Sequence, residues 1–347
     1  MGSTLHAFGA ISAACCYTPQ HKLRSWSWQT YWLTQAAICW LIAPIIAAII
    51  TIPKLTTVLS QAPTDAMRIT FILGACYGIG GTAFGLAIRH VGYSITYAIA
   101  IGLSCVLGTL TGPILKGTLV TIIEKPGSQW VIMGIVVGMV GIVLCGLAGR
   151  WKELDLQKND KTAGRIHFSL AKGLPLCLVA GILSAVYGIA INDTGKPIAE
   201  IAALHGAGHW QTNIIYIFAN TGAFVTSAIY VIYLGIKEKT LNEFIMPKGI
   251  SLRSQINNYL FAILTGCLWF GQFLFYGLGH VRMGQLQFSS WAIHMIMLIL
   301  FSTFVGFIMR EWISCRRRSY MAIATAIVVL IGSVLLLTYG NYLGAAK

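Results

Sequence analysis

Residues 283–309 read MGQLQFSSWAIHMIMLILFSTFVGFIM, a run of 27 residues without an Asp, Glu, Lys or Arg. A helix of about 20 apolar residues crosses the hydrocarbon core of a bilayer, which is about 30 Å thick. A helix also satisfies its own backbone hydrogen bonds, which matters because lipid tails offer no partners. This run therefore predicts a transmembrane helix.

The same pattern recurs along the whole chain. Of the 347 residues, 56% are hydrophobic and only 10% are charged, whereas an ordinary soluble domain has about 25% charged residues. This composition excludes a soluble globular protein, a disordered chain and a disulfide scaffold. The sequence instead predicts an all-α integral membrane protein with ten transmembrane helices. The ten runs without charged residues are 1–21, 25–53, 69–88, 90–115, 126–149, 173–192, 201–236, 254–281, 283–309 and 319–346.

The basic residues are distributed unevenly among the connections between these runs. The net charge is +14, from 24 Lys and Arg against 10 Asp and Glu. Seventeen of the Lys and Arg follow the odd-numbered helices and seven lie elsewhere. Because cytoplasmic loops are enriched in Lys and Arg, both termini are predicted to lie outside. This distribution explains the charge without a nucleic-acid partner. Basic residues follow the first run rather than precede it, so we expect a retained helix and not a cleaved signal peptide.

The two halves of the chain resemble each other. A shift of 192 positions places Gly74 on Gly266 and Tyr77 on Trp269, so the third predicted helix repeats as the eighth. Each half has an odd number of helices, so the halves are predicted to be inverted in the membrane, with a central cavity and alternating access. The predicted divisions are residues 1–150 for the first five-helix repeat, 151–172 for a cytoplasmic linker and 173–347 for the second repeat.

Polar and aromatic residues recur at helical spacing inside four of the predicted helices and mark faces that avoid lipid. Such residues can be hydrogen-bonding contacts between packed helices or part of the interfacial belt. A buried amide or imidazole is costly without partners, and we therefore interpret Gln272, Gln287 and His294 as ligands of a solute or an ion. The full candidate set for solute binding is Trp269, Gln272, Tyr276, Gln287, Ser290, Trp291, Tyr97 and Tyr187.

The chemistry of these groups favours a neutral, polyhydroxylated ligand. Amides and hydroxyls pair with hydroxyl groups, and aromatic faces cover the C–H side of a sugar. A cationic cargo would require buried carboxylates, but only Asp193, Glu200 and Glu311 lie at or near helix ends. Asp193 and Glu200 are read either as a solvated turn and helix cap or as proton-binding groups. The sequence has no catalytic motif, and its cysteines lack metal-ligand spacing, so neither an enzyme nor a cofactor is expected.

Six segments of the chain together form a long, aromatic-rich pattern. They are SAACCYTP (12–19), WSW (26–28), RHVGYS (89–94), QFLFYGLGH (272–280), SWAIHM (290–295) and EW (311–312). In this order they resemble the L-rhamnose–proton symporter family. The resemblance implies ten helices, membership of the drug/metabolite transporter superfamily, and proton-driven uptake of a deoxy-sugar across a bacterial inner membrane. Its partners would be the sugar, a coupling cation and membrane lipid.

The chain departs from the family pattern at three positions. Where the family has an acidic residue, an Asn and a Trp, this chain has Gln287, Gly81 and Tyr77. Without that carboxylate, His294 is the leading proton acceptor inside the membrane because imidazole titrates near neutral pH. Asp193 and Glu200 are its competitors. The alternatives left open are coupling to sodium, transport of another small metabolite, and a membrane sugar sensor that does not transport.

Overall fold

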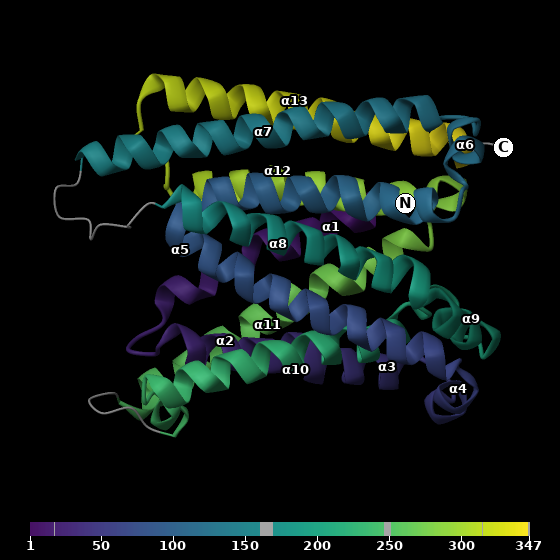
Figure 1. Cartoon of the computed structure of the whole chain (residues 1–347), viewed down its shortest axis with the longest axis horizontal. Coiled ribbons are helices and arrows are strands. Elements are labelled where there is room, and N and C mark those ends of the chain that lie inside the picture. Colours follow the sequence, from purple (N-terminus) through teal and green to yellow (C-terminus); the bar gives the residue numbers. More distant parts are fainter. Residues whose placement is uncertain (17, 160–168, 246–250, 314, 346–347) are drawn as a thin grey trace. The chain divides into compact units, whose positions relative to one another are not determined.

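The computed structural model describes residues 1–16, 18–159, 169–245, 251–313 and 315–345 (Figure 1). Within these ranges every regular element is helical, which confirms the all-α prediction. Nine helical segments of the described residues are long and apolar enough to cross a membrane. They are Trp28–Thr51, Thr64–Ile88, Ile95–Leu115, Ser128–Leu156, Ala171–Leu204, Gly208–Lys237, Leu252–His280, Gly284–Ile308 and Arg317–Gly344.

The helical elements, with short 3-10 and π segments labelled η, are α1 (Gly2–Cys15), η1 (Thr18–Lys22), α2 (Trp28–Ala36), η2 (Ala37–Ile42), α3 (Ala43–Thr51), α4 (Leu55–Gln61), α5 (Thr64–Leu115), α6 (Leu119–Ile123), α7 (Ser128–Asn159), α8 (Leu170–Ile189), η3 (Ala190–Thr194), α9 (Lys196–Leu204), η4 (Gly208–Trp210), α10 (Asn213–Lys237), η5 (Leu241–Phe244), α11 (Leu252–His280), η6 (Gly284–Ser289), α12 (Ser290–Ile308) and α13 (Arg317–Ala345).

Three of the predicted spans take a different form in the structure. The first becomes α1, whose 14 residues rise only about 21 Å, so α1 is not among the nine spans. The third and fourth join into one helix, α5, of 52 residues. Arg89 interrupts the apolar run, but a charge does not break the hydrogen bonding of a helix.

The described residues fall into two compact units. The first unit comprises Met1–Ala14, Gly80–Ile189 and Gly279–Lys347. The second unit comprises Cys15–Ile79 and Ala190–Leu278. Each unit therefore draws segments from both halves of the sequence, and the three-part division along the chain stays a prediction.

In the first unit, α7 and α13 run side by side (Figure 1). Glycines allow this approach, since a Cβ at Gly134 would lie 3.0 Å from the backbone nitrogen of Leu337. The Ser333 hydroxyl of α13 donates a hydrogen bond of 2.6 Å to the Gly134 carbonyl. Small residues and hydroxyls at helix contacts are the usual means of packing helices in lipid.

One end of this helix pair is held by a buried carboxylate. The side chain of Asp155 on α7 is fully buried. It accepts hydrogen bonds from the Arg316 backbone nitrogen at 2.9 Å and from the Ser319 hydroxyl at 2.7 Å. The Arg318 guanidinium lies 3.6 Å from the Asp155 carboxylate. The negative charge also sits at the N-terminus of α13, where the helix dipole favours it.

In the second unit, α10 packs closely against the first part of α5. A Cβ at Gly74 would collide with the Ala219 carbonyl. The Thr226 hydroxyl donates a hydrogen bond of 2.8 Å to the Ala75 carbonyl. These contacts fix the part of α5 that carries Tyr77.

Candidate functional site

The second unit contains an aromatic cluster formed by Trp32, Trp40, Tyr77 and Trp269. Trp40 lies at its centre, with ring centroids 5.3 Å from Trp269, 5.9 Å from Tyr77 and 6.4 Å from Trp32. The rings meet edge to face, the arrangement that the quadrupoles of aromatic rings favour. Of these four residues, the sequence analysis named only Trp269 as a candidate for solute binding.

Trp40 belongs to η2, a π-helical segment between α2 and α3. The segment is continuous with both neighbours, so the three elements form the single span Trp28–Thr51. π-turns inside α-helices are rare and occur frequently at functional sites. This local departure from α geometry marks the region around Trp40 as a candidate site.

Gln35 precedes Trp40 on the same span, and both residues carry polar groups that the described residues leave unpaired. Gln35 and Trp40 are each 0% exposed. Neither the amide nitrogen and oxygen of Gln35 nor Nε1 of Trp40 has a hydrogen-bond partner within the described part of the chain. Burying such a group unpaired costs about 1–3 kcal/mol, and native proteins rarely do so without a reason. A ligand with hydroxyl groups that reached this region would meet polar atoms that have no partner among the described residues.

Nearby polar groups of α2 are satisfied by the protein itself. Nε1 of Trp32 donates to the Ser227 hydroxyl at 2.9 Å, and the Tyr31 hydroxyl donates to Thr265 at 2.8 Å. The unpaired state of Gln35 and Trp40 is thus not a general property of this helix. Neither residue was predicted from the sequence, although an amide inside the uncharged run 25–53 is a signal that could identify Gln35.

α11 brings the sequence-predicted residues of the second unit toward this region. A Cβ at Gly266 would lie 2.8 Å from the backbone oxygen of Gln35, so the glycine permits close packing of α11 on the span that carries Gln35. Trp269 follows one turn later, and Gln272, which is 9% exposed, follows Trp269 by three residues. The Tyr276 hydroxyl donates a hydrogen bond of 2.9 Å to Asn192.

The two acidic candidates also belong to the second unit. Asp193 is half-buried in the π-helical segment η3, next to Asn192. Glu200 on α9 is exposed and lies 3.8 Å from Lys196, one turn away. The structure therefore places Asp193, and not Glu200, in a partly water-shielded position.

The first unit holds a different set of the predicted residues around Trp291. Nε1 of Trp291 donates hydrogen bonds of 3.1 Å to the backbone oxygen and the hydroxyl of Ser104. The Ser104 hydroxyl donates in turn to Ser184 at 2.9 Å. The Tyr187 ring lies 6.5 Å from the Trp291 ring, between centroids. A Cβ at Gly108 would lie 2.5 Å from Nε1 of Trp291, so the indole is tightly enclosed.

Gln287, Ser290, Trp291 and His294 recur at helical spacing in the predicted helix 283–309, but they do not lie on one continuous α-helix. Gln287 lies in the 3-10 segment η6, where Leu286 has non-helical backbone angles, and α12 begins only at Ser290. The Gln287 amide nitrogen donates to the His280 carbonyl at 3.0 Å. The expectation of one continuous α-helical face was therefore wrong for Gln287.

Two further candidates in the first unit differ in their surroundings. The Ser290 hydroxyl is buried and has no hydrogen-bond partner among the described residues. The Tyr97 ring packs edge to face on Phe84, with centroids 5.0 Å apart. Of these two, Ser290 offers a polar atom to a solute or water, while the structure places the Tyr97 ring in an aromatic contact.

His294 has a neighbour that the sequence analysis did not identify. Its ring lies 5.8 Å from that of His6 on α1, between centroids, and both residues are buried. Among the described residues no group of three or more His, Cys, Asp or Glu is arranged to hold a metal ion. The structure thus places a second imidazole beside the proton-binding candidate His294.

The nine apolar spans of the described residues define a multi-pass membrane protein whose interior contains amides, indoles and imidazoles. The family model described as L-rhamnose-proton symport protein (RhaT) matches residues 1–343. The chain belongs to this family, which confirms the resemblance seen in the sequence. The family is one of transporters and not of enzymes.

Individual relatives support the same assignment. The chain is 32% identical over 336 residues to an L-rhamnose-proton symporter of Escherichia coli O1:K1 / APEC, with 95% of each chain covered. It is also 32% identical over 337 residues to an L-rhamnose-proton symporter of Cronobacter sakazakii (strain ATCC BAA-894), with 95% of this chain and 94% of the relative covered. The similarity therefore extends over essentially the whole of each protein.

Proposed function

We propose that this protein is a secondary active transporter that carries L-rhamnose or a related neutral deoxy-sugar into a bacterial cell together with a proton. The family match over residues 1–343 carries the proposal. It is supported by the uncharged character of the buried polar groups, because hydroxyl-bearing solutes pair with amides and need no buried counter-charge.

The proposed architecture has ten crossings in two inverted five-helix repeats, with both termini on the periplasmic side of the inner membrane. α1 would be the tenth crossing. Lys22, the first basic residue of the chain, would mark the cytoplasmic side of this crossing. The excess of basic residues in the odd connections supports this orientation.

The proposed sugar contacts in the second unit are made by Gln35, Trp40 and the sequence-predicted residues of α11. Trp40 and Trp269 would cover the apolar face and methyl group of a deoxy-sugar, while the amides of Gln35 and Gln272 would bind its hydroxyls. Tyr276 would act beside them as a hydroxyl partner. The unpaired amide of Gln35 is the observation that supports this placement best.

The remaining predicted residues supply a second set of solute contacts, in the first unit. We propose that the Ser290 hydroxyl and the Gln287 amide bind hydroxyl groups or water along the transport path. Trp291, Tyr97 and Tyr187 would provide the aromatic surface there. The Ser104 bonds of Trp291 would hold its ring in place in the state described by the structure.

For coupling, we propose that His294 takes up the proton, with His6 as its partner. Two imidazolium ions this close repel each other in a water-poor interior, so the pair would hold a single proton at a time. Asp193 and Glu200 are the alternative carriers, and the half-buried Asp193 is the stronger of the two.

Counterflow of labelled L-rhamnose in proteoliposomes tests the proposal. Exchange of labelled for unlabelled sugar, with uphill uptake under an inward proton gradient, is the expected result. Binding without exchange would indicate a sensor, and neither binding nor exchange would indicate a transporter of another metabolite. Uphill uptake that requires sodium in place of the pH gradient would refute proton coupling.

A further inference from the structure

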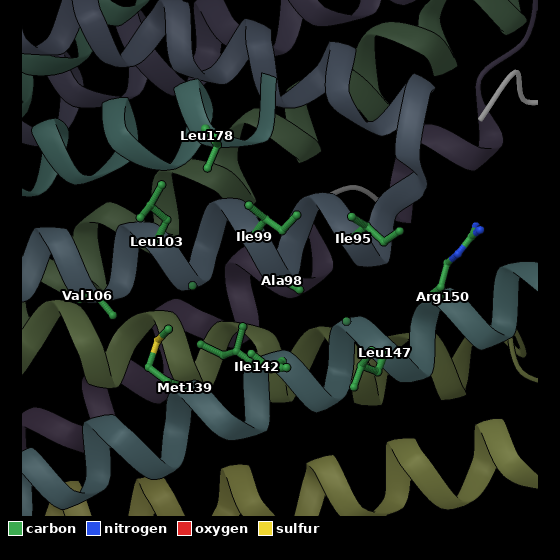
Figure 2. Close-up of a pocket in the computed structure, with 13 residues that line it drawn as sticks. Ile95, Ala98, Ile99, Leu103, Val106, Met139, Ile142, Leu147, Arg150 and Leu178 are labelled. Carbon is green, nitrogen blue, oxygen red and sulfur yellow. The ribbon is translucent and has the colours of Figure 1, made fainter. Parts of the chain in front are cut away.

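The first unit carries a groove of about 660 Å³ between the second part of α5, α7 and α8 (Figure 2). Thirteen residues line it, of which twelve are aliphatic residues, methionine or glycine. The thirteenth is Arg150, whose side chain lies at one end of the row in Figure 2. The groove thus combines an apolar trough with one terminal cation.

The groove opens to the outside of the helices that form it. Val143, Leu147 and Leu178, which line it, are 55%, 46% and 43% exposed. In a protein that spans a membrane, an exposed aliphatic surface on spanning helices faces the lipid. The trough is therefore accessible to an acyl chain from the surrounding bilayer.

The length of the groove corresponds to one leaflet. Its lining residues run from Ile95 to Val106 on α5 and from Met139 to Arg150 on α7. Eleven helical steps cover about 16 Å, close to half of the hydrocarbon core of about 30 Å. A lipid that reached from Arg150 to the end of the trough would span one leaflet.

Arg150 begins the connection after the fifth predicted helix, which also carries Lys152 and Lys172 and is the most basic connection of the chain. α8 begins beside α5, since the Ser169 backbone nitrogen donates to the His90 carbonyl at 3.0 Å. Its first turn carries the exposed Lys172. The distribution of basic residues predicts that the Arg150 end of the groove faces the cytoplasm, whose leaflet is rich in anionic lipids.

We propose that this groove is a binding site for an anionic phospholipid, with an acyl chain in the trough and the phosphate group on Arg150. The charge of Arg150 selects the headgroup, and the aliphatic walls of α5, α7 and α8 hold the chain. The inference does not rest on the proposed transport activity, because it concerns a surface formed within the first unit alone.

Native mass spectrometry of the purified, delipidated protein tests this site with phosphatidylglycerol and with phosphatidylcholine as the zwitterionic control. The unchanged protein should retain phosphatidylglycerol preferentially. Arg150→Gln should weaken phosphatidylglycerol binding about fivefold, the effect expected for one cation at an anionic membrane surface. Arg253→Gln removes the same charge from an exposed position of the second unit and should change nothing.

A second variant tests the trough itself. Ala98 lines the groove in Figure 2, and Ala98→Phe should reduce retention of both lipids by filling the space for the acyl chain. Equal retention of the two lipids by the unchanged protein, or a loss in Arg253→Gln as large as in Arg150→Gln, would overturn the proposal. It would also be overturned if Ala98→Phe converted a dimer to a monomer without altering lipid retention, because the groove would then be an interface between copies.

Discussion

The indole of Trp40 meets the indole of Trp269 at an angle of 62°, with ring centroids 5.3 Å apart. The two residues come from segments more than 200 positions apart in the chain, and Nε1 of Trp40 is buried without a hydrogen-bond partner among the described residues. Buried polar atoms are ordinarily paired. The unpaired N–H group of Trp40 therefore distinguishes this contact from ordinary aromatic packing. Together with the unpaired Gln35 amide, this contact supports the proposed sugar contacts.

Replacing Gln35 by Leu separates a binding role from a packing role. If the Gln35 amide binds sugar hydroxyls, Gln35→Leu should weaken sugar affinity by about 1–3 kcal/mol, roughly fivefold to 150-fold. The thermal stability of the sugar-free protein should stay the same or increase, because a buried, unpaired amide is replaced by an apolar group of similar size. Equilibrium binding and thermal melting in detergent measure the two effects.

Gln255 provides the matched control for this change. It is also a buried glutamine of the second unit, but its amide accepts from Nε1 of Trp26 at 3.0 Å and donates to the Glu243 carbonyl at 2.8 Å. Gln255→Leu should therefore lower stability and leave sugar affinity unchanged. If Gln35→Leu left the sugar affinity unchanged, the Gln35 amide would not be a sugar contact.

Trp40→Phe should weaken sugar binding less than Trp269→Ala. The first change keeps a six-membered aromatic ring and removes the five-membered ring with its unpaired N–H group, whereas the second removes a whole stacking surface, for which about 0.5–1.5 kcal/mol beyond area burial is typical. Titration of tryptophan fluorescence with L-rhamnose measures both affinities. Equal affinities in both variants and the unchanged protein would show that the aromatic cluster only packs the second unit.

Asp155→Asn should lower the melting temperature without changing transport per folded molecule. The carboxylate accepts two hydrogen bonds that join α7 to the start of α13, and its charge faces Arg316 and Arg318. Asp65→Asn is the control, because Asp65 forms an exposed ion pair with Arg68 at 3.3 Å, and exposed pairs contribute little. If Asp155→Asn lowered the melting temperature less than Asp65→Asn does, the Asp155 carboxylate would not stabilise the contact between α7 and α13.

The positions of the spans were predictable from the sequence because lipid imposes a single rule on every buried backbone segment. A run of about 20 uncharged residues signals a helix whatever its neighbours are. The continuity of α5 was not predictable, since Arg89 ends an apolar run without ending the helix. The 3-10 segment at Gln287 was missed because helical spacing was applied across a local change in backbone geometry.

Gln35 and Trp40 escaped prediction for a different reason. Periodicity identifies which residues share a helix face, but it does not reveal whether their hydrogen bonds are satisfied. That depends on partners brought in from distant segments, such as Ser227 beside Trp32 and Thr265 beside Tyr31. Only the folded structure distinguishes these paired groups from the unpaired amide of Gln35.

Proton coupling is expected to depend on the imidazole pair of the first unit. His294→Gln should abolish uphill sugar uptake driven by a pH gradient and preserve downhill exchange, because the amide can hydrogen-bond but cannot carry a proton at neutral pH. His6→Gln should weaken uphill uptake less severely, since His294 remains. Uptake and counterflow by the same proteoliposomes, with and without a pH gradient, measure both activities.

The controls for coupling come from the second unit and from Gln287. His205→Gln should leave uptake unchanged, because this imidazole lies at an exposed hydrogen bond of 2.7 Å with Gln61. Gln287→Asp should restore pH-driven uptake to His294→Gln, because it supplies a carboxylate at the position where the family resemblance implies an acidic residue. Uphill uptake that persists in His294→Gln would exclude His294 as the carrier. Asp193→Asn and Glu200→Gln in the same assay would then show whether either acidic residue carries the proton, and a requirement for sodium in all variants would refute proton symport.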